Sequence, residues 1–170
     1  KNRAIPDDAI FVPGHTGDFI SGGHIHYVFD EKTDNITIDG LSEKMLKKHY
    51  ALWPLMLKNP QIKKRAVCKL SESFKNFKLN SAQSIVDAYE YWEWQERQAK
   101  FIINSVRVYD FWGYEWRIPL WDSELMDFWG RITYALKVRK KLYLEYLEKT
   151  DSFGIFGNNL RRNKLYQKRA

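Results

Sequence analysis

Apolar residues recur every three or four positions over most of this chain, which is the spacing of helices that bury one face. One such helix is expected from Ser42 to Pro54, where proline ends or kinks it. Another is expected from Asn59 to Leu79, because asparagine caps helices well and Pro60 suits the first helical position.

The longest helical pattern runs over 82–108, after a cap at Asn80–Ser81. Its apolar residues occupy several faces, so we expect this helix to be central. Shorter helices are expected after a cap at Asp122 or Ser123, and over 138–147.

Short apolar runs near the N-terminus predict extended structure. Ala9–Val12 is expected to be a buried strand, and Ile36–Ile38 is compatible with a second extended piece. A lone strand is not stable and the chain does not begin with methionine, so we expect it to be part of a longer protein. The predicted fold is mainly α with one or two N-terminal strands. Residues 1–150 form the main domain portion and 151–170 a basic tail.

The glycine-rich turn Pro13–Ile25 follows the strand and carries one carboxylate, Asp18. Glycine allows backbone N–H groups to converge on phosphate or another anion. Asp18 can hold a Mg²⁺ ion that bridges phosphate oxygens. A short helix interrupted at Gly22–Gly23 is expected within 18–27. The turn is a candidate nucleotide site, and the alternative is a connection that needs glycine only for its geometry.

Composition narrows the class of protein. With 44% apolar and 16% aromatic residues among 170, the chain can build a packed core and is not of the disordered type. The formal net charge of +7 favours anionic partners, the alternative being a solvated basic surface. Cys68 is the one cysteine, which excludes an internal disulfide, and its apolar neighbours predict a buried thiol. The sequence shows neither an apolar run of membrane-spanning length nor a signal peptide, so a cytoplasmic location is expected.

Three histidines lie close together in the sequence, at His15, His24 and His26. Two histidines separated by one residue can bind zinc, but neither cysteine nor glutamate completes a set nearby. His15, between flexible neighbours, is better placed to act as an acid or base, and the alternative is a surface histidine.

Three further segments combine charge with large apolar residues. Alternation places Glu115 and Arg117 on one side of an extended segment, where they can pair with each other or Arg117 can hold an anionic ligand. The basic run over 137–141 crowds a helix start, which favours an anionic contact, although a solvated face is the simpler interpretation. Aromatic and cationic residues interleave over 92–109, which would suit stacking of RNA bases, although a central helix explains them more simply.

Two of these segments, in this order, resemble motifs of the asparagine synthetase family. The family loop reads roughly S-G-E-G-x-D-E-x-F-G-G-Y, and the similar stretch here is Pro13–His24. A later family motif reads E-x-R-x-P-F-L-D-x-x-L, and Glu115–Leu125 is similar to it. Tyr134–Lys137 looks like the family's P-x-x-L-K turn. The resemblance covers roughly residues 10–147.

The resemblance implies the C-terminal, mostly helical part of an ATP-pyrophosphatase-type domain, which is similar to adenine nucleotide alpha hydrolases. Family members use ATP and Mg²⁺ to adenylate a carboxylate and then release pyrophosphate. Ammonia, usually supplied by an N-terminal glutaminase domain, attacks the acyl-adenylate to give an amide.

The resemblance also implies roles for single residues. Asp18 would bind magnesium and pyrophosphate, and Glu115 and Arg117 would brace or line the substrate side. Gly14 would lie against the AMP portion. The cofactor-binding positions implied are Gly14, Thr16 and Gly17.

The sequence departs from the family pattern at several places. The S-G-G-x-D-S pyrophosphate loop is not found in these residues, nor is a glutaminase domain. The loop glutamate that is tied to amide formation is replaced by His15, which would then serve as the base unless the substrate differs. The Asp-Glu pair is Asp18–Phe19 here. Arg161, Arg162 or Lys164 would substitute for the later lysine segment of the family.

The function predicted is part of an ATP-dependent amide-forming synthetase, with His15 and Asp18 as catalytic residues and ATP and Mg²⁺ as cofactors. Its expected ligands are a small carboxylate and an ammonia donor, and its expected partners are N-terminal domains of the same protein, not nucleic acid or membrane. These residues alone are expected to be inactive. The alternatives are a basic helical module that binds nucleic acid or another polyanion, and a degenerate homologue without catalysis.

Overall fold

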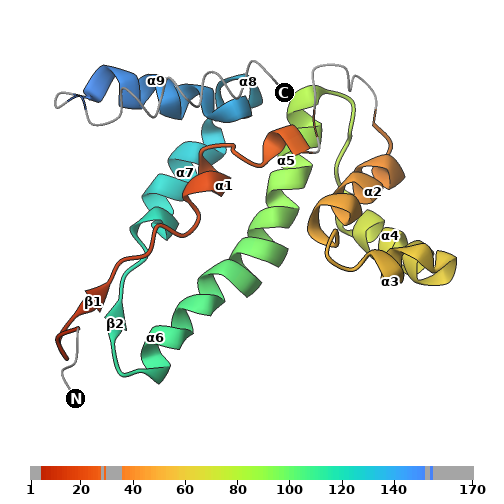
Figure 1. The fold of residues 1–170 in the computed structure, drawn as a ribbon. Helices are drawn as coiled ribbons and strands as arrows, with labels where there is room; N and C mark the ends of the chain where they lie inside the picture. The colour runs from red at the N-terminus through yellow and green to blue at the C-terminus, as the bar shows by residue number, and fades with distance from the viewer. Residues whose placement is uncertain (1–4, 28, 30–35, 152–153, 155–170) are drawn as a thin grey trace.

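A continuous helical rod from Ala82 to Phe111 forms the axis of the structure (Figure 1). The structure is a computed structural model that describes residues 5–27, 29, 36–151 and 154. The rod confirms the long helix expected over 82–108. It changes its winding, however, from α to π at Glu93 and through one 3-10 turn near its end. Its segments are α5 (Ala82–Trp92), η2 (Glu93–Ile103), η3 (Asn104–Val106) and α6 (Arg107–Phe111).

The main core surrounds the first part of the rod. On one side of α5 lie α2 (Ile38–His49), α3 (Pro54–Lys58) and α4 (Pro60–Phe74) (Figure 1). α2, α4 and α5 meet through one connected set of buried apolar side chains, because each presents one apolar stripe to the others, and Leu57 of α3 packs against this set. Its largest fully buried members are Tyr89, Phe74, Ile25, Leu41, Met45 and Ile85.

The expectation that this helix is central is confirmed for its first part, while several apolar side chains farther along the rod face solvent. Ile85 and Trp92 are buried in its first part, but Phe101 is 66% and Phe111 is 79% exposed. The apolar residues on several faces therefore mark a change of environment along the helix rather than burial on all sides.

Side-chain caps set where the helices begin. Asn59 accepts hydrogen bonds from two backbone N–H groups at the start of α4, and Asp122 does the same at the start of α7 (Ser123–Arg131), as predicted. Thr37 accepts from the N–H of Gly40 at 3.1 Å, so α2 begins at Ile38, before Ser42. Of the possible extended piece over 36–38, Thr37 has an extended backbone, but Ile38 is already helical.

The exposed face of α4 carries Cys68, so the prediction of a buried thiol was wrong. Leu70 and Phe74 are the buried residues of this helix. At 100° per residue, Cys68 projects from the side opposite to them despite its apolar neighbours in sequence. The helix also ends at Phe74, before the expected Leu79.

Two segments that lie about a hundred residues apart in the sequence meet in a pair of short parallel strands, β1 (Ile10–Phe11) and β2 (Glu115–Trp116). Ile10 lies opposite Glu115, and the N–H of Arg117 donates to the carbonyl of Phe11 at 2.8 Å. The predicted strand therefore exists, but it is not buried, because Ile10 is 51% and Val12 is 61% exposed. The fold class, mainly α with two short strands at one end, is confirmed.

After β2, the chain runs back beside the rod through α7, and the last helix then points away from the rod (Figure 1). A smaller core joins α1 (Gly17–Ile20) to α7 through Phe19, Ile20 and Trp129. The last helix begins at Lys141 rather than at the expected Val138. None of the helices that the structure describes is long and apolar enough to cross a lipid bilayer. The remaining elements are η1 (Ile25–Tyr27), η4 (Pro119–Trp121), α8 (Tyr134–Lys137), η5 (Val138–Lys140) and α9 (Lys141–Thr150).

The predicted boundary between a domain portion, 1–150, and a basic tail, 151–170, stays a prediction. Of the tail, only Asp151 and Gly154 belong to the described residues. The candidate cations Arg161, Arg162 and Lys164 lie outside them.

Candidate functional site

The glycine-rich turn forms a single helical turn, α1, that closes on itself. The N–H of Gly23 donates to the carbonyl of Asp18 at 2.8 Å, and the Ser21 hydroxyl donates to the carbonyl of Gly17 at 2.6 Å. Gly22 has a φ of +83°, a conformation that residues with a side chain rarely adopt. The helix expected over 18–27 is therefore split at Gly22.

The turn is packed against the basic run of residues 137–140. A Cβ atom on Gly22 would lie 2.3 Å from the carbonyl oxygen of Lys137, and one on Gly23 would lie 2.4 Å from the Cε of Lys140. Glycine is therefore required here both by the backbone conformation and by the close approach of another segment.

We expect Gly22→Ala to lower the free energy of unfolding by about 2 kcal/mol or more, because it adds left-handed strain to an overlap with backbone. Urea denaturation would measure the loss. Gly130→Ala is the matched control, since Gly130 lies in α7 with no atom within 4 Å of the place that a Cβ would occupy, and helix propensity favours alanine there by about 0.5–1 kcal/mol. Equal stability of Gly22→Ala and the unchanged protein would contradict this interpretation.

Asp18 faces solvent and pairs with Lys140. Its side chain is 68% exposed, and its carboxylate accepts a hydrogen bond from the Lys140 Nζ. That hydrogen bond lowers the pKa of Asp18, while partial burial works in the opposite direction. The turn thus presents an ionised carboxylate beside a cation.

The basic run makes anionic contacts within the protein itself. Lys137 is buried and donates to Glu90 at 2.7 Å, and Lys140 pairs with Asp18. Arg139 and Lys140 both have positive φ values, 55° and 59°, so the chain turns sharply before α9. The sequence left open whether the basic run contacts an anion or forms a solvated face. Lys137 and Lys140 both contact a carboxylate.

The other predicted residues of the turn differ in their surroundings. Gly14 is open, with no atom within 4 Å of the position of a Cβ, whereas a Cβ on Gly17 would lie 3.1 Å from Leu120. Thr16 is buried at a φ of 77°, which is strained for a β-branched residue. Its hydroxyl has no hydrogen-bond partner among the described residues. The Nε2 of His15 lies 3.2 Å from the Ser105 hydroxyl of the rod.

Glu115 and Arg117 pair with each other at the strand end of the molecule. The Nη2 of Arg117 lies 2.9 Å from the Glu115 carboxylate, and both side chains are more than 60% exposed. The alternation prediction is confirmed to that extent. Within the part of the chain that the structure describes, no contact joins this pair to Asp18, so a shared site stays a prediction.

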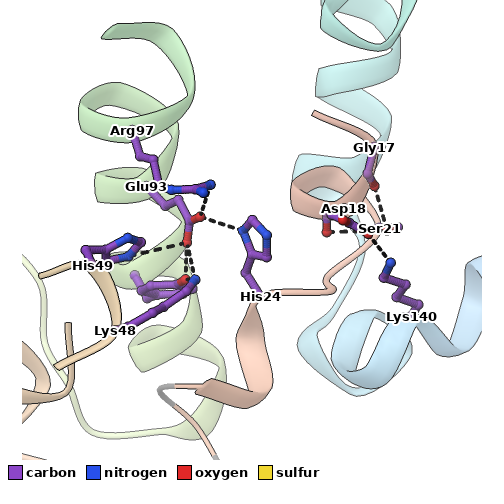
Figure 2. Close-up of polar contacts among 10 residues, drawn as sticks. Gly17, Asp18, Ser21, His24, Lys48, His49, Glu93, Arg97 and Lys140 are labelled. Atoms are coloured by element: carbon purple, nitrogen blue, oxygen red, sulfur yellow. Dashed lines mark hydrogen bonds and ion pairs between the residues drawn. The ribbon is translucent and has the colours of Figure 1, made fainter. Parts of the chain in front are cut away.

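Sequence reasoning missed the most densely bonded polar group of the structure, the Glu93 cluster, made of Glu93 and the residues around its carboxylate (Figure 2). The carboxylate is fully buried where the rod changes from α to π winding. It lies 2.5 Å from His24 Nδ1, 2.9 Å from Lys48 Nζ and 3.4 Å from Arg97 Nη1. The hydroxyl of Tyr89 also donates to it, and the Nε2 of His49 lies 3.9 Å away.

The Glu93 cluster keeps its carboxylate charged. Burial opposes ionisation of Glu93, but the hydrogen bond from His24 and the charge of Lys48 outweigh it and lower the pKa to about 2. Burial lowers the pKa of His49 to about 4, against the attraction of Glu93, so this imidazole is neutral at pH 7. Burial and the carboxylate both raise the pKa of Tyr89. The cluster is therefore an anion enclosed by hydrogen-bond donors.

A comparison with protein families identifies the family of the chain that carries this turn. Residues 11–150, from the first strand to the end of the last helix, match the family described as Asparagine synthase. The chain belongs to the asparagine synthase family. Comparison with curated proteins and with solved structures gives no match. Membership confirms the resemblance and supports the ATP-pyrophosphatase-type fold. It also makes the chain part of a family of ATP-dependent amide-forming ligases that generally use ATP and Mg²⁺.

The residues of this asparagine synthase family member fit a Mg²⁺ ion that is held jointly by the protein and by the phosphates of a substrate. Mg²⁺ usually keeps several waters and binds one or two carboxylates together with substrate phosphates. Asp18 is one ionised, solvent-facing carboxylate of that type. Within the described residues there is no group of three or more His, Cys, Asp or Glu side chains that would hold a metal by themselves. The fit is therefore to a metal shared with phosphate.

One signal of the Glu93 cluster was present in the sequence. Tyr89, Glu93 and Arg97 recur every four residues and so share one face of a helix. His24 and Lys48 reach that face only through the tertiary fold, and no spacing rule relates them to it.

Proposed function

We propose that this chain supplies part of the active site of a synthetase that activates a carboxylate as an acyl-adenylate for attack by ammonia. The family match, which spans both motifs, supports it. The observation that carries it is Asp18: an ionised, exposed carboxylate on a closed glycine turn, beside the cation Lys140.

In this proposal each residue of the turn has a defined task. Asp18 would hold Mg²⁺, which, when bound, offsets the charge of the phosphate oxygens. Lys140 orients the Asp18 carboxylate, and the open space at Gly14 leaves room for the nucleotide. His15 would accept a proton from the attacking ammonia, in place of the family's glutamate.

Other parts of the synthetase are the proposed partners. Parallel strands normally lie inside larger, covered sheets, and a two-stranded pair is marginal by itself. The β1–β2 pair leaves Ile10 and Val12 exposed, and Phe111 and Trp112 are exposed at the adjoining end of the rod. This apolar surface is suited to a domain that carries the pyrophosphate loop.

Asp18→Asn tests the proposal in the protein combined with the domain that supplies the pyrophosphate loop. We expect ATP-dependent pyrophosphate exchange to fall by about 100-fold or more, because the carboxylate that would hold Mg²⁺ for the departing pyrophosphate loses its charge. The melting temperature should hardly change, since the side chain is exposed. Asp127→Asn, an exposed aspartate of α7, is the matched control and should retain exchange.

Two outcomes would favour the alternatives. Tight RNA binding with a steep dependence on salt would indicate a polyanion-binding module. The pairing of Lys137 with Glu90 and of Lys140 with Asp18 speaks against that alternative, because neither lysine is a free surface charge. A folded, fully assembled protein without exchange would indicate a degenerate homologue.

A further inference from the structure

Glu93 connects the glycine-rich turn to the helical rod through His24. His24 directly follows Gly23, whose N–H closes the turn on the carbonyl of Asp18 at 2.8 Å. The His24 ring points toward Glu93, and its Nδ1 lies 2.5 Å from the carboxylate (Figure 2). After the hydrogen bond from Lys140, the charge of His24 also contributes to lowering the pKa of Asp18, so His24 and Asp18 are electrostatic neighbours.

The other hydrogen-bond partners of Glu93 hold its carboxylate in one position. Lys48 comes from α2, whereas Tyr89 and Arg97 come from the same helical rod as Glu93 itself. A buried carboxylate with donors on several sides has a single favourable position, since leaving any donor unpaired costs free energy. The orientation of the His24 ring is therefore set by groups outside the turn.

The position of Glu93 in the rod is also consistent with a role in orienting His24. The winding changes from α to π at this residue, and such changes are frequent at functional sites. A plain helix-to-loop contact would not need a buried charge, because apolar packing of similar volume is as stabilising.

We propose that Glu93 is a positioning residue of the candidate site: by holding the His24 ring, it fixes the turn that presents Asp18. The functional importance of this contact rests on the proposed function, in which Asp18 holds Mg²⁺. The mechanical connection itself can be measured without activity.

Hydrogen exchange of the Gly23 N–H in the ¹⁵N-labelled protein tests this connection. His24→Phe keeps a ring but removes the donor to Glu93, and we expect exchange to be about tenfold faster, with displaced Gly22 and Gly23 signals. His24→Asn places an amide N–H near the position of Nδ1 and should restore most of the protection. Glu93→Gln should behave as His24→Phe does. If it fails to fold, the two His24 variants decide.

Lys48→Met is the matched control. It removes one donor to Glu93 Oε2, to which Tyr89 also donates, and leaves the His24 bond to Oε1 in place. It should therefore lower the melting temperature but change Gly23 exchange far less than His24→Phe does. A purely structural cluster would respond alike to Lys48→Met and His24→Phe, which would overturn the proposal. Unchanged Gly23 exchange in His24→Phe would overturn it as well.

A titration with Mg²⁺ and inorganic pyrophosphate, followed on the same glycine signals, separates this inference from the proposed function. We expect weaker binding in His24→Phe and unchanged binding in His24→Asn and Lys48→Met. If the unchanged protein, combined with the domain that carries the pyrophosphate loop, does not respond, the proposed role of Asp18 fails. The exchange measurements still decide the role of Glu93.

Discussion

Replacing Glu93 with alanine is expected to lower the free energy of unfolding by about 3–5 kcal/mol, the usual result of removing one partner from a buried ion pair. Lys48 and Arg97 would keep their charges near a site that has lost its anion, and the Tyr89 hydroxyl would lose its acceptor. Urea denaturation at pH 7 would measure the loss. The effect should be among the largest for a single substitution in this protein, because the Glu93 carboxylate is fully buried and accepts hydrogen bonds from several donors.

Glu96→Ala is the control for this substitution. Glu96 lies one helical turn away and pairs with Lys100 at 2.6 Å, but both side chains are at least 40% exposed. Such pairs contribute about 0.3–0.5 kcal/mol. If Glu93→Ala and Glu96→Ala were equally stable, the Glu93 cluster would not be the enclosed anion described above.

Stability is expected to fall as the pH is lowered from about 6.5 toward 4, because of His49. Burial lowers the pKa of His49 from 6.5 to about 4 in the folded protein. Between these values the unfolded chain binds a proton that the folded chain does not, so acidification favours unfolding. The shift corresponds to a loss on the order of 3 kcal/mol, since one pKa unit is about 1.4 kcal/mol.

Urea denaturation at a series of pH values checks this prediction, with His49→Gln as the comparison. The variant should show a shallower dependence between pH 6.5 and 4. Some dependence should remain, because burial also lowers the pKa of His26. The pKa of Glu93, at about 2, places its own loss of stability at lower pH, between about 4.5 and 2. Identical pH profiles would show that His49 is not buried in its neutral form.

Local features of this fold could be predicted from sequence, and contacts across the chain could not. Asn59, Ser81 and Asp122 were recognisable as caps because a cap needs only its own next three residues. The pairing of Ile10 with Glu115 depends on the path of everything between them. Periodicity located the long helix for the same local reason, but it carried no information about its change to π winding.

The candidate site shows the same division. The turn and Asp18 were found because glycine spacing and a carboxylate are visible in a single short segment. The partners that define their surroundings, Lys140 for Asp18 and Glu93 for His24, come from distant segments. Exposure was the least predictable property, as Cys68 illustrates, because an apolar neighbour in sequence can lie on the opposite side of a helix.

The parallel pairing of β1 with β2 has a consequence for biosynthesis. A strand near residue 10 must wait until residue 115 has left the ribosome before it can find its neighbour. The contact between Asp18 and Lys140 forms later still, when almost all of the described chain has been made. Completion of the proposed metal-binding turn by Lys140 is therefore a late event, and a polypeptide that ends before residue 140 would have the turn without this cation.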